Sequence, residues 1–251
     1  MKRLFDFESL IDLIYRQKKI CYICGEYNPF IEKNLCGKCR SRYSLYDKDI
    51  CSICGRKIEL EENAIGKEHS CFQCISNRNI YDGGIAVFNY SKNIKKLIAE
   101  FKYEEELYLK EFFAYEMANR IKSTDIYQDI DFIISVPMSI NRLKTRGYNQ
   151  ADILAELVSK FLNIPYEDSL LKKIDKEKSQ KGLSRIQRIR NIKDSFIINK
   201  GRDEDIYKKN ILIIDDVYTT GTTVNEISRV LKKKNADKVY FLTLASTPFN
   251  V

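Results

Sequence analysis

The feature of this sequence that most restricts its fold is a set of eight cysteines between residues 21 and 74. Two cysteines separated by two residues can direct both sulfur atoms at one ion across a tight turn, and two such turns form a tetrahedral four-sulfur site. The spacing therefore predicts two structural zinc sites in tandem zinc ribbons. The predicted ligands form four Cys-x2-Cys pairs: Cys21 and Cys24, Cys36 and Cys39, Cys51 and Cys54, and Cys71 and Cys74.

Other uses of the cysteines fit this pattern less well. Disulfides would require an oxidising compartment, and a catalytic dithiol more often uses a single Cys-x2-Cys pair than four in series. Glycines follow Cys24 and Cys54 and supply the backbone freedom that a tight metal-binding turn needs. The sequence leaves two points open: the pairs could be joined in an interleaved order, and His69 could replace one thiolate, although a plain surface histidine is favoured.

The first 19 residues, MKRLFDFESLIDLIYRQKK, predict an amphipathic helix that docks on the protein. Acidic residues at 6, 8 and 12 interrupt the apolar core that a signal peptide requires. No apolar run in the chain approaches the roughly 20 residues needed to span a bilayer. We therefore expect a cytoplasmic protein without stable membrane insertion; peripheral contact with the inner face of the membrane is the alternative.

Beyond the cysteines, strand and helix patterns alternate. We predict strands at 84–90, 131–137, 195–199, 210–215 and 238–245, and helices at 92–102, 106–122, 148–162 and 222–234. This alternation predicts an α/β fold with a mostly parallel sheet flanked by helices. Turn residues at 78–82 place the boundary between a small N-terminal domain, 1–78, and a larger domain, 79–251.

Residues 211–228, ILIIDDVYTTGTTVNEIS, join an apolar strand to two acidic residues and a turn rich in hydroxyl groups. We predict that the strand ends at Asp215 and Asp216, at the carboxyl edge of the sheet, where α/β proteins bind ligands. The following helix start favours a phosphate through its free N–H groups and partial positive charge. Carboxylates accept hydrogen bonds from sugar hydroxyls and hold Mg²⁺. The motif thus predicts a sugar-phosphate site; a simple helix cap after an acidic loop is the alternative.

This string resembles the phosphoribosyl-pyrophosphate-binding motif of type I phosphoribosyltransferases. Other segments narrow the resemblance to the competence protein F family: Val136-Pro137, the run RGYNQA at 146–151, Ser179-Gln180, and the stretch 97–103 with Lys102. A zinc ribbon ahead of a transferase domain is typical of that family. The resemblance covers nearly the whole chain and implies a type I phosphoribosyltransferase fold preceded by a small zinc-ribbon domain.

The resemblance implies roles for individual residues. Two acidic residues would bind the ribose hydroxyls, the turn would bind the 5-phosphate, and basic residues after the second strand would hold pyrophosphate. The basic segment 172–190 would be the loop that closes over the ligand. The implied ligands of phosphoribosyl pyrophosphate, bound with Mg²⁺, are Asp215, Asp216, Thr219, Thr220, Gly221, Thr222, Thr223, Arg142, Arg146, Asn149, Gln180 and Arg188. Asp215, Asp216 and Arg146 are the implied catalytic residues.

Two functions are consistent with these features. The first is a phosphoribosyltransferase that acts on an acceptor the sequence does not define, in DNA uptake during natural transformation. The second is a non-catalytic module that senses phosphoribosyl pyrophosphate and binds single-stranded DNA or uptake-machinery proteins. The formal net charge of +8 favours phosphorylated or polyanionic partners and is compatible with both.

Overall fold

A computed structural model describes residues 19–31, 33–45, 50–58, 70–76, 79–103, 107–174 and 192–248. The chain forms two compact units, Met1–Arg42 and Tyr43–Val251. Several sequence predictions lie outside the described residues: the N-terminal helix, His69, and most of the basic segment 172–190 with Gln180 and Arg188. The boundary between residues 78 and 79 stays a prediction.

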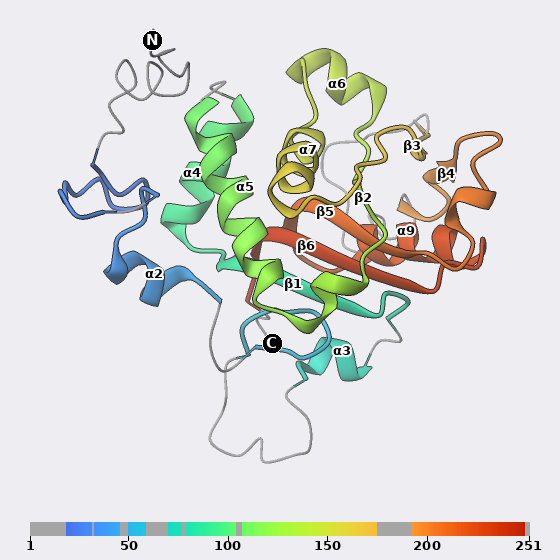
Figure 1. Ribbon diagram of the computed structural model, residues 1–251, viewed down its shortest axis with the longest axis horizontal. Coiled ribbons are helices and arrows are strands. Elements are labelled where there is room, and N and C mark those ends of the chain that lie inside the picture. Colours follow the sequence, from blue (N-terminus) through green and yellow to red (C-terminus); the bar gives the residue numbers. More distant parts are fainter. Residues whose placement is uncertain are drawn as a thin grey trace, which may run out of the picture. The chain divides into compact units, whose positions relative to one another are not determined.

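The larger unit is built on a four-stranded parallel sheet (Figure 1). Its strands are β1 (Gly83–Asn89), β2 (Phe132–Ser135), β5 (Asn210–Tyr218) and β6 (Lys238–Ser246), in the order β1-β6-β5-β2. Each of the two central strands contains at least four consecutive buried residues, because both of their faces are covered. The predicted parallel sheet flanked by helices is therefore confirmed.

Helices cover the two faces of this sheet (Figure 1). On one face, α5 (Leu107–Lys122) contacts β1 and β6, and α7 (Gln150–Leu162) contacts β2 and β5. On the other face, α9 (Thr222–Lys232) contacts β6. Helix α4 (Lys92–Tyr103) packs against α5, and the short α6 (Ile140–Arg146) follows β2. Two 3-10 turns, Asp125–Asp129 and Glu204–Ile206, precede β2 and β5.

The strand predicted at 195–199 lies outside the main sheet. It is β4 (Phe196–Ile198), and it pairs antiparallel with β3 (Leu171–Lys173) as a separate two-stranded sheet. Its apolar residues pack instead toward α9 and the core beneath it. The sequence pattern identified the strand but not the sheet it joins, because periodicity does not encode the pairing partner.

The core beside α9 also contains the second group of cysteines. Cys51, Cys54, Cys71 and Cys74 are buried in one cluster with residues of β5, β6 and α9. Within the same unit, the backbone of Gly55 lies so close to β1 that a Cβ at this position would come within 2.6 Å of the Gly84 carbonyl oxygen. This cysteine group is therefore packed onto the α/β body rather than separated from it.

No helix among the described segments is both long enough and apolar enough to cross a membrane.

Candidate ligand site and cysteine centres

The two acidic residues of the motif lie within β5, not at its end. The strand continues to Tyr218 because β6 runs beside it, with Asp215 opposite Thr243 and Tyr218 opposite Ser246. Strand β2, the neighbour on the other side, pairs with β5 only as far as Ser135 opposite Ile214. The predicted strand end at Asp215 and Asp216 was therefore wrong by three residues, yet these carboxylates do lie where one neighbouring strand has stopped.

The pair of carboxylates has an uneven electrostatic environment. Burial, together with the adjacent Asp216 charge, raises the pKa of Asp215 to about 7. The Asp216 carboxylate forms an ion pair with the Lys102 ammonium from the last turn of α4, and both side chains are 21% exposed. The backbone N–H of Asp216 donates to Asp215 Oδ1 at 2.9 Å. One carboxylate thus has a fixed cationic partner, whereas burial favours the neutral form of the other.

The hydroxyl-rich turn opens α9 as the sequence predicts. Gly221 is the N-cap in the left-handed conformation, with φ of 73°, and as a glycine it supplies no side-chain hydrogen bond to the first turn of this helix. A Cβ at Gly221 would also lie 2.6 Å from the Tyr218 hydroxyl oxygen. The Thr220 and Thr222 hydroxyl oxygens are 2.8 Å apart. A glycine N-cap leaves backbone donors for an anion at the helix start, and flanking hydroxyls add further donors.

The loop after β2 carries the residues predicted to hold pyrophosphate. Arg142 is exposed on α6, and its backbone N–H is capped by the Ser139 hydroxyl at 3.4 Å. Arg146 ends that helix and donates from Nη1 to Gln150 Oε1 at 2.6 Å. Gln150 in turn donates to the Lys102 carbonyl oxygen at 3.4 Å. A continuous set of contacts therefore joins Arg146, through Gln150 and Lys102, to Asp216.

Two further residues fix this loop to α4 and α7. The Tyr148 hydroxyl donates to the Phe101 carbonyl oxygen at 2.7 Å, which supports a packing role for that ring. The buried Asn149 accepts from the Ala151 N–H as the N-cap of α7 and donates to the Val136 carbonyl oxygen at 3.1 Å. Both side chains hold the loop in place, and a contact between Asn149 and the ligand stays a prediction.

A polar cluster underlies the same loop. Asp152 in the first turn of α7 accepts hydrogen bonds from Ser135, from Tyr166 at 3.1 Å and from Asn149 at 2.9 Å. Burial raises the pKa of Asp152, and these three hydrogen bonds oppose that shift. The cluster connects the end of β2 to the start of α7, which keeps the intervening loop at the carboxyl edge of the sheet.

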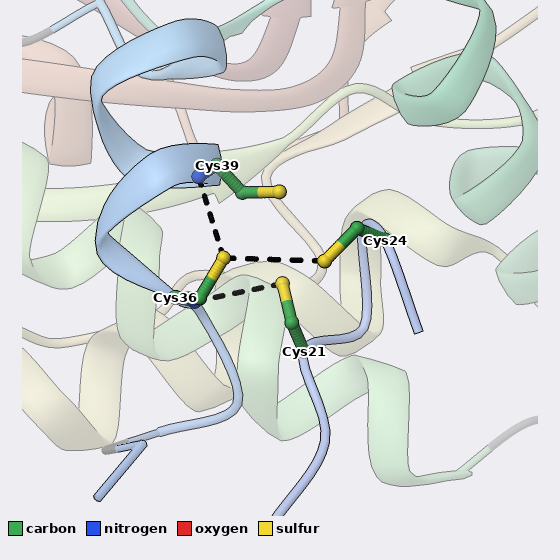
Figure 2. A group of neighbouring side chains, drawn as sticks. All are labelled: Cys21, Cys24, Cys36 and Cys39. Atoms are coloured by element: carbon green, nitrogen blue, oxygen red, sulfur yellow. Dashed lines mark hydrogen bonds between the residues drawn. The ribbon is translucent and has the colours of Figure 1, made fainter. Parts of the chain in front are cut away.

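The cysteines of the smaller unit form one tetrad. Cys21, Cys24, Cys36 and Cys39 have sulfur atoms that all lie within 4.8 Å of one another, and Figure 2 shows them converging. Cys24 Sγ and Cys36 Sγ are 4.0 Å apart, and the Cys36 N–H donates to Cys21 Sγ at 3.5 Å. Gly25 adopts a positive φ of 76° in the first turn, and α2 (Gly37–Tyr43) begins directly after Cys36.

The remaining cysteines form an equivalent tetrad in the larger unit. The sulfur atoms of Cys51, Cys54, Cys71 and Cys74 also lie within 4.8 Å of one another. Cys54 Sγ and Cys71 Sγ are 3.7 Å apart, and Gly55 has a φ of 64°. Helix α3 (Phe72–Ser76) carries the second turn.

Both tetrads fit a tetrahedral zinc ion. With a Zn–S bond of about 2.3 Å, the sulfur atoms of a tetrahedral site lie about 3.8 Å apart, close to the distances in both groups. Backbone N–H groups that point at Cys21 and Cys51 sulfur would stabilise thiolates. The grouping is sequential rather than interleaved.

Three residues near the ligand site were not among the predicted ligands. Lys102 contacts Asp216, Arg56 donates from Nη2 to the Thr219 carbonyl oxygen, and Gln73 donates to the Thr220 carbonyl oxygen at 2.6 Å. The only signal in the sequence was indirect: Lys102 belongs to the stretch that resembles the family. Arg56 and Gln73 lie inside the cysteine segment, and spacing does not indicate that this segment reaches the turn.

Comparisons with known families agree with this architecture. The double zinc ribbon domain matches residues 10–75, and the phosphoribosyl transferase domain matches residues 143–248. The chain is thus a protein with a double zinc ribbon followed by a phosphoribosyltransferase-type domain.

Its relatives define the family. "Competence protein F" of Haemophilus influenzae is 31% identical over 178 residues, which cover 70% of this chain and 77% of the relative. "Competence protein ComFC" of Streptococcus pneumoniae is 30% identical over 159 residues, or 63% of this chain and 66% of the relative. "DNA utilization protein YhgH" of Shigella flexneri is 28% identical over 225 residues, or 85% of this chain and 97% of the relative. The chain belongs to the competence protein F family.

Proposed function

We propose that the protein binds phosphoribosyl pyrophosphate with Mg²⁺ at the carboxyl edge of the sheet and transfers the phosphoribosyl group to an acceptor during DNA uptake. The observation that carries the proposal is the placement of two acidic residues on β5 a few residues before a helix start whose N-cap is Gly221 at positive φ. The helix start suits a phosphate, and the two carboxylates suit vicinal hydroxyls. The role in DNA uptake rests on relatives named for competence and DNA utilisation.

Each group has a defined task in this proposal. The turn 219–223 binds the 5-phosphate through backbone N–H groups and threonine hydroxyls. Asp215 and Asp216 accept hydrogen bonds from the ribose hydroxyls, and their oxygen atoms are the donors that Mg²⁺ prefers. When bound, Mg²⁺ neutralises charge on the pyrophosphate. Arg142 and Arg146 contact the pyrophosphate oxygens through guanidinium N–H groups, so that negative charge on the leaving group is stabilised.

The reaction forms a bond between the acceptor and the anomeric carbon and breaks the bond from that carbon to pyrophosphate. Lys102 shares the carboxylate site and forms an ion pair with Asp216 in the ligand-free protein. On binding, its ammonium faces a ligand with several negative charges and adds to the cationic surroundings of the leaving group. Gln180 and Arg188 complete the proposal as residues of the basic loop that closes over the ligand and excludes water.

Calorimetric titration tests ligand binding. Phosphoribosyl pyrophosphate with Mg²⁺ is titrated into the wild type and into the Asp215→Ala/Asp216→Ala variant, and we expect binding by the wild type and a loss of at least 100-fold in the variant. The matched control is Glu204→Ala/Asp205→Ala, an adjacent acidic pair exposed before β5, which should bind as the wild type does. Absence of binding by the wild type would refute the proposal.

Release of pyrophosphate separates transfer from binding alone. The wild type is incubated with phosphoribosyl pyrophosphate, Mg²⁺ and candidate purine, pyrimidine or amine acceptors, and pyrophosphate is measured. We expect release that depends on one acceptor class and disappears in the Asp215→Ala/Asp216→Ala variant. Tight binding without release from any acceptor would leave a sensor of phosphoribosyl pyrophosphate and contradict the transfer step.

A further inference from the structure

Two residues beside the second cysteine tetrad form hydrogen bonds with the turn 219–223. Arg56, two residues after Cys54, donates from Nη2 to the Thr219 carbonyl oxygen. Gln73, between Cys71 and Cys74, donates from Nε2 to the Thr220 carbonyl oxygen at 2.6 Å. Arg56 is 2% exposed and Gln73 is 8% exposed, so solvent competes little with either hydrogen bond. Each of the two cysteine-bearing turns therefore supplies one buried donor. The acceptors are the carbonyl groups of two consecutive residues, Thr219 and Thr220.

These two bonds determine where the neighbouring N–H groups point. A trans peptide group is planar, and its C=O and N–H bonds are directed to opposite sides. When Arg56 holds the Thr219 carbonyl, the Thr220 N–H faces away from the tetrad. When Gln73 holds the Thr220 carbonyl, the Gly221 N–H also faces away from the tetrad. Two consecutive amides are thereby presented on the side of the turn opposite the cysteine centre.

Further contacts join the second cysteine tetrad to the end of β5. The Tyr81 hydroxyl lies 2.9 Å from the Tyr218 hydroxyl and 3.9 Å from Cys74 Sγ. The Tyr218 ring stacks on Phe241 with the ring centroids 4.7 Å apart, and the Arg56 guanidinium lies 5.1 Å from the centroid of the Tyr218 ring. Tyr218 is the last residue of β5, so the end of the strand and the turn that follows it share one support.

We propose that Arg56 and Gln73 are positioning residues that aim the Thr220 and Gly221 amides at the ligand phosphate, so that the second cysteine centre controls binding at the phosphate turn. This inference rests on the proposed function, because it assigns the phosphate to turn 219–223. The zinc ion that fits this tetrad would fix the two metal-binding turns, and these turns fix the two carbonyl groups.

The experiment uses the full chain with its zinc bound and compares Gln73→Met, Arg56→Met and the wild type. Methionine keeps much of the side-chain volume but lacks the N–H donor. The matched control is Gln128→Met, an exposed position in the turn before β2. Three quantities are measured: zinc per chain, affinity for phosphoribosyl pyrophosphate with Mg²⁺, and the NMR order parameters of the Thr220 and Gly221 amides without ligand.

We expect zinc content to stay at the wild-type value and affinity to fall by 10- to 100-fold in Gln73→Met and Arg56→Met. The order parameters of both amides should fall from about 0.85 toward 0.6 in these variants, the range that separates rigid from flexible backbone. Gln128→Met should match the wild type in all three quantities. Because Gln73→Met removes one hydrogen bond only, it remains informative if Arg56→Met fails to fold.

The readouts separate this inference from the proposed function. Unchanged amide order in Gln73→Met overturns the inference, whether or not the wild type binds phosphoribosyl pyrophosphate. Reduced order with unchanged affinity overturns it as well, since the two amides would not contribute to binding. If the wild type binds no phosphoribosyl pyrophosphate, the proposed function fails and the assignment of the phosphate to this turn fails with it, while amide order still shows whether the tetrad supports the turn.

Discussion

The Lys102 ammonium, at the end of α4, forms an ion pair with the Asp216 carboxylate on β5. Both side chains are 21% exposed, so solvent screens this pair less than a surface pair. Asp215 precedes Asp216 and adds a second acidic group to the same strand. Lys102 therefore offsets the charge of an acidic site that would otherwise destabilise the ligand-free fold.

A double-mutant cycle on Lys102 and Asp216 tests this charge balance. With Lys102→Met and Asp216→Asn, singly and together, we expect a coupling free energy of about 1–2 kcal/mol in urea unfolding at pH 8, because a half-buried charge loses its partner in each single variant. The control cycle is Lys96 with Glu100 on the same helix, where Lys96 is 79% exposed and coupling should be about 0.5 kcal/mol or less. Equal coupling in the two cycles would contradict the special role of Lys102.

The raised pKa of Asp215 predicts a pH-dependent stability difference. Because its pKa is about 7 in the folded protein and lower in the unfolded chain, the stability it contributes as a neutral group is lost as pH rises toward and through 7. Asp215→Asn removes this titration. We expect the variant to gain stability over the wild type by about 2 kcal/mol more at pH 8 than at pH 5.5. Urea unfolding at both pH values measures this difference in stability between the variant and the wild type. A difference that does not change with pH would contradict the raised pKa of Asp215.

The sequence predicted most strands and helices of the larger unit because buried strands and amphipathic helices differ in hydrophobic period. The length of β5 could not be predicted in this way. Asp215 and Asp216 interrupt the apolar run, yet the strand continues to Tyr218 because β6 provides hydrogen-bonding partners there. Pairing between distant segments decided the strand end, and local pattern does not contain that information.

In the candidate site too, the sequence predicts local features but not contacts between distant segments. The acidic pair and the hydroxyl-rich turn are contiguous, so a local motif identifies them. Lys102, Arg56 and Gln73 reach the site from other segments, and their contacts depend on how α4 and the second cysteine tetrad pack on the α/β body. The cysteine spacing predicted metal-binding turns without indicating that one tetrad would support the ligand turn.

Zinc stoichiometry tests the sequential grouping of the cysteines. We expect two zinc ions per chain in the wild type and one in Cys21→Ser/Cys24→Ser, since Cys51, Cys54, Cys71 and Cys74 form a complete site without them. A variant with the whole first tetrad replaced, Cys21→Ser/Cys24→Ser/Cys36→Ser/Cys39→Ser, should still bind one zinc, because the second tetrad stays complete, whereas an interleaved grouping would leave neither site complete. Elemental analysis after gel filtration measures the ratio. Loss of all tightly bound zinc from the fourfold variant would contradict the sequential grouping.

Replacing Gly221 tests whether the turn 219–223 binds the ligand. Its φ of 73° is unfavourable for other residues, and a Cβ would lie 2.6 Å from the Tyr218 hydroxyl oxygen. We expect Gly221→Ala to weaken binding of phosphoribosyl pyrophosphate by at least 100-fold, because the turn must shift away from Tyr218, and to leave zinc content unchanged. Calorimetry and elemental analysis measure the two quantities.

Gly201→Ala is the matched control for Gly221→Ala. Gly201 has a similar φ of 83°, but within the part of the chain that the structure describes, no heavy atom beyond Gly201 and its two chain neighbours lies within 4 Å of a Cβ at this position. This variant should incur only the backbone strain, about 1 kcal/mol of unfolding free energy, and bind the ligand as the wild type does. If both variants lose affinity equally, general destabilisation explains the loss. If neither does, turn 219–223 does not hold the phosphate, and the ligand site must be sought among other residues at the carboxyl edge of the sheet.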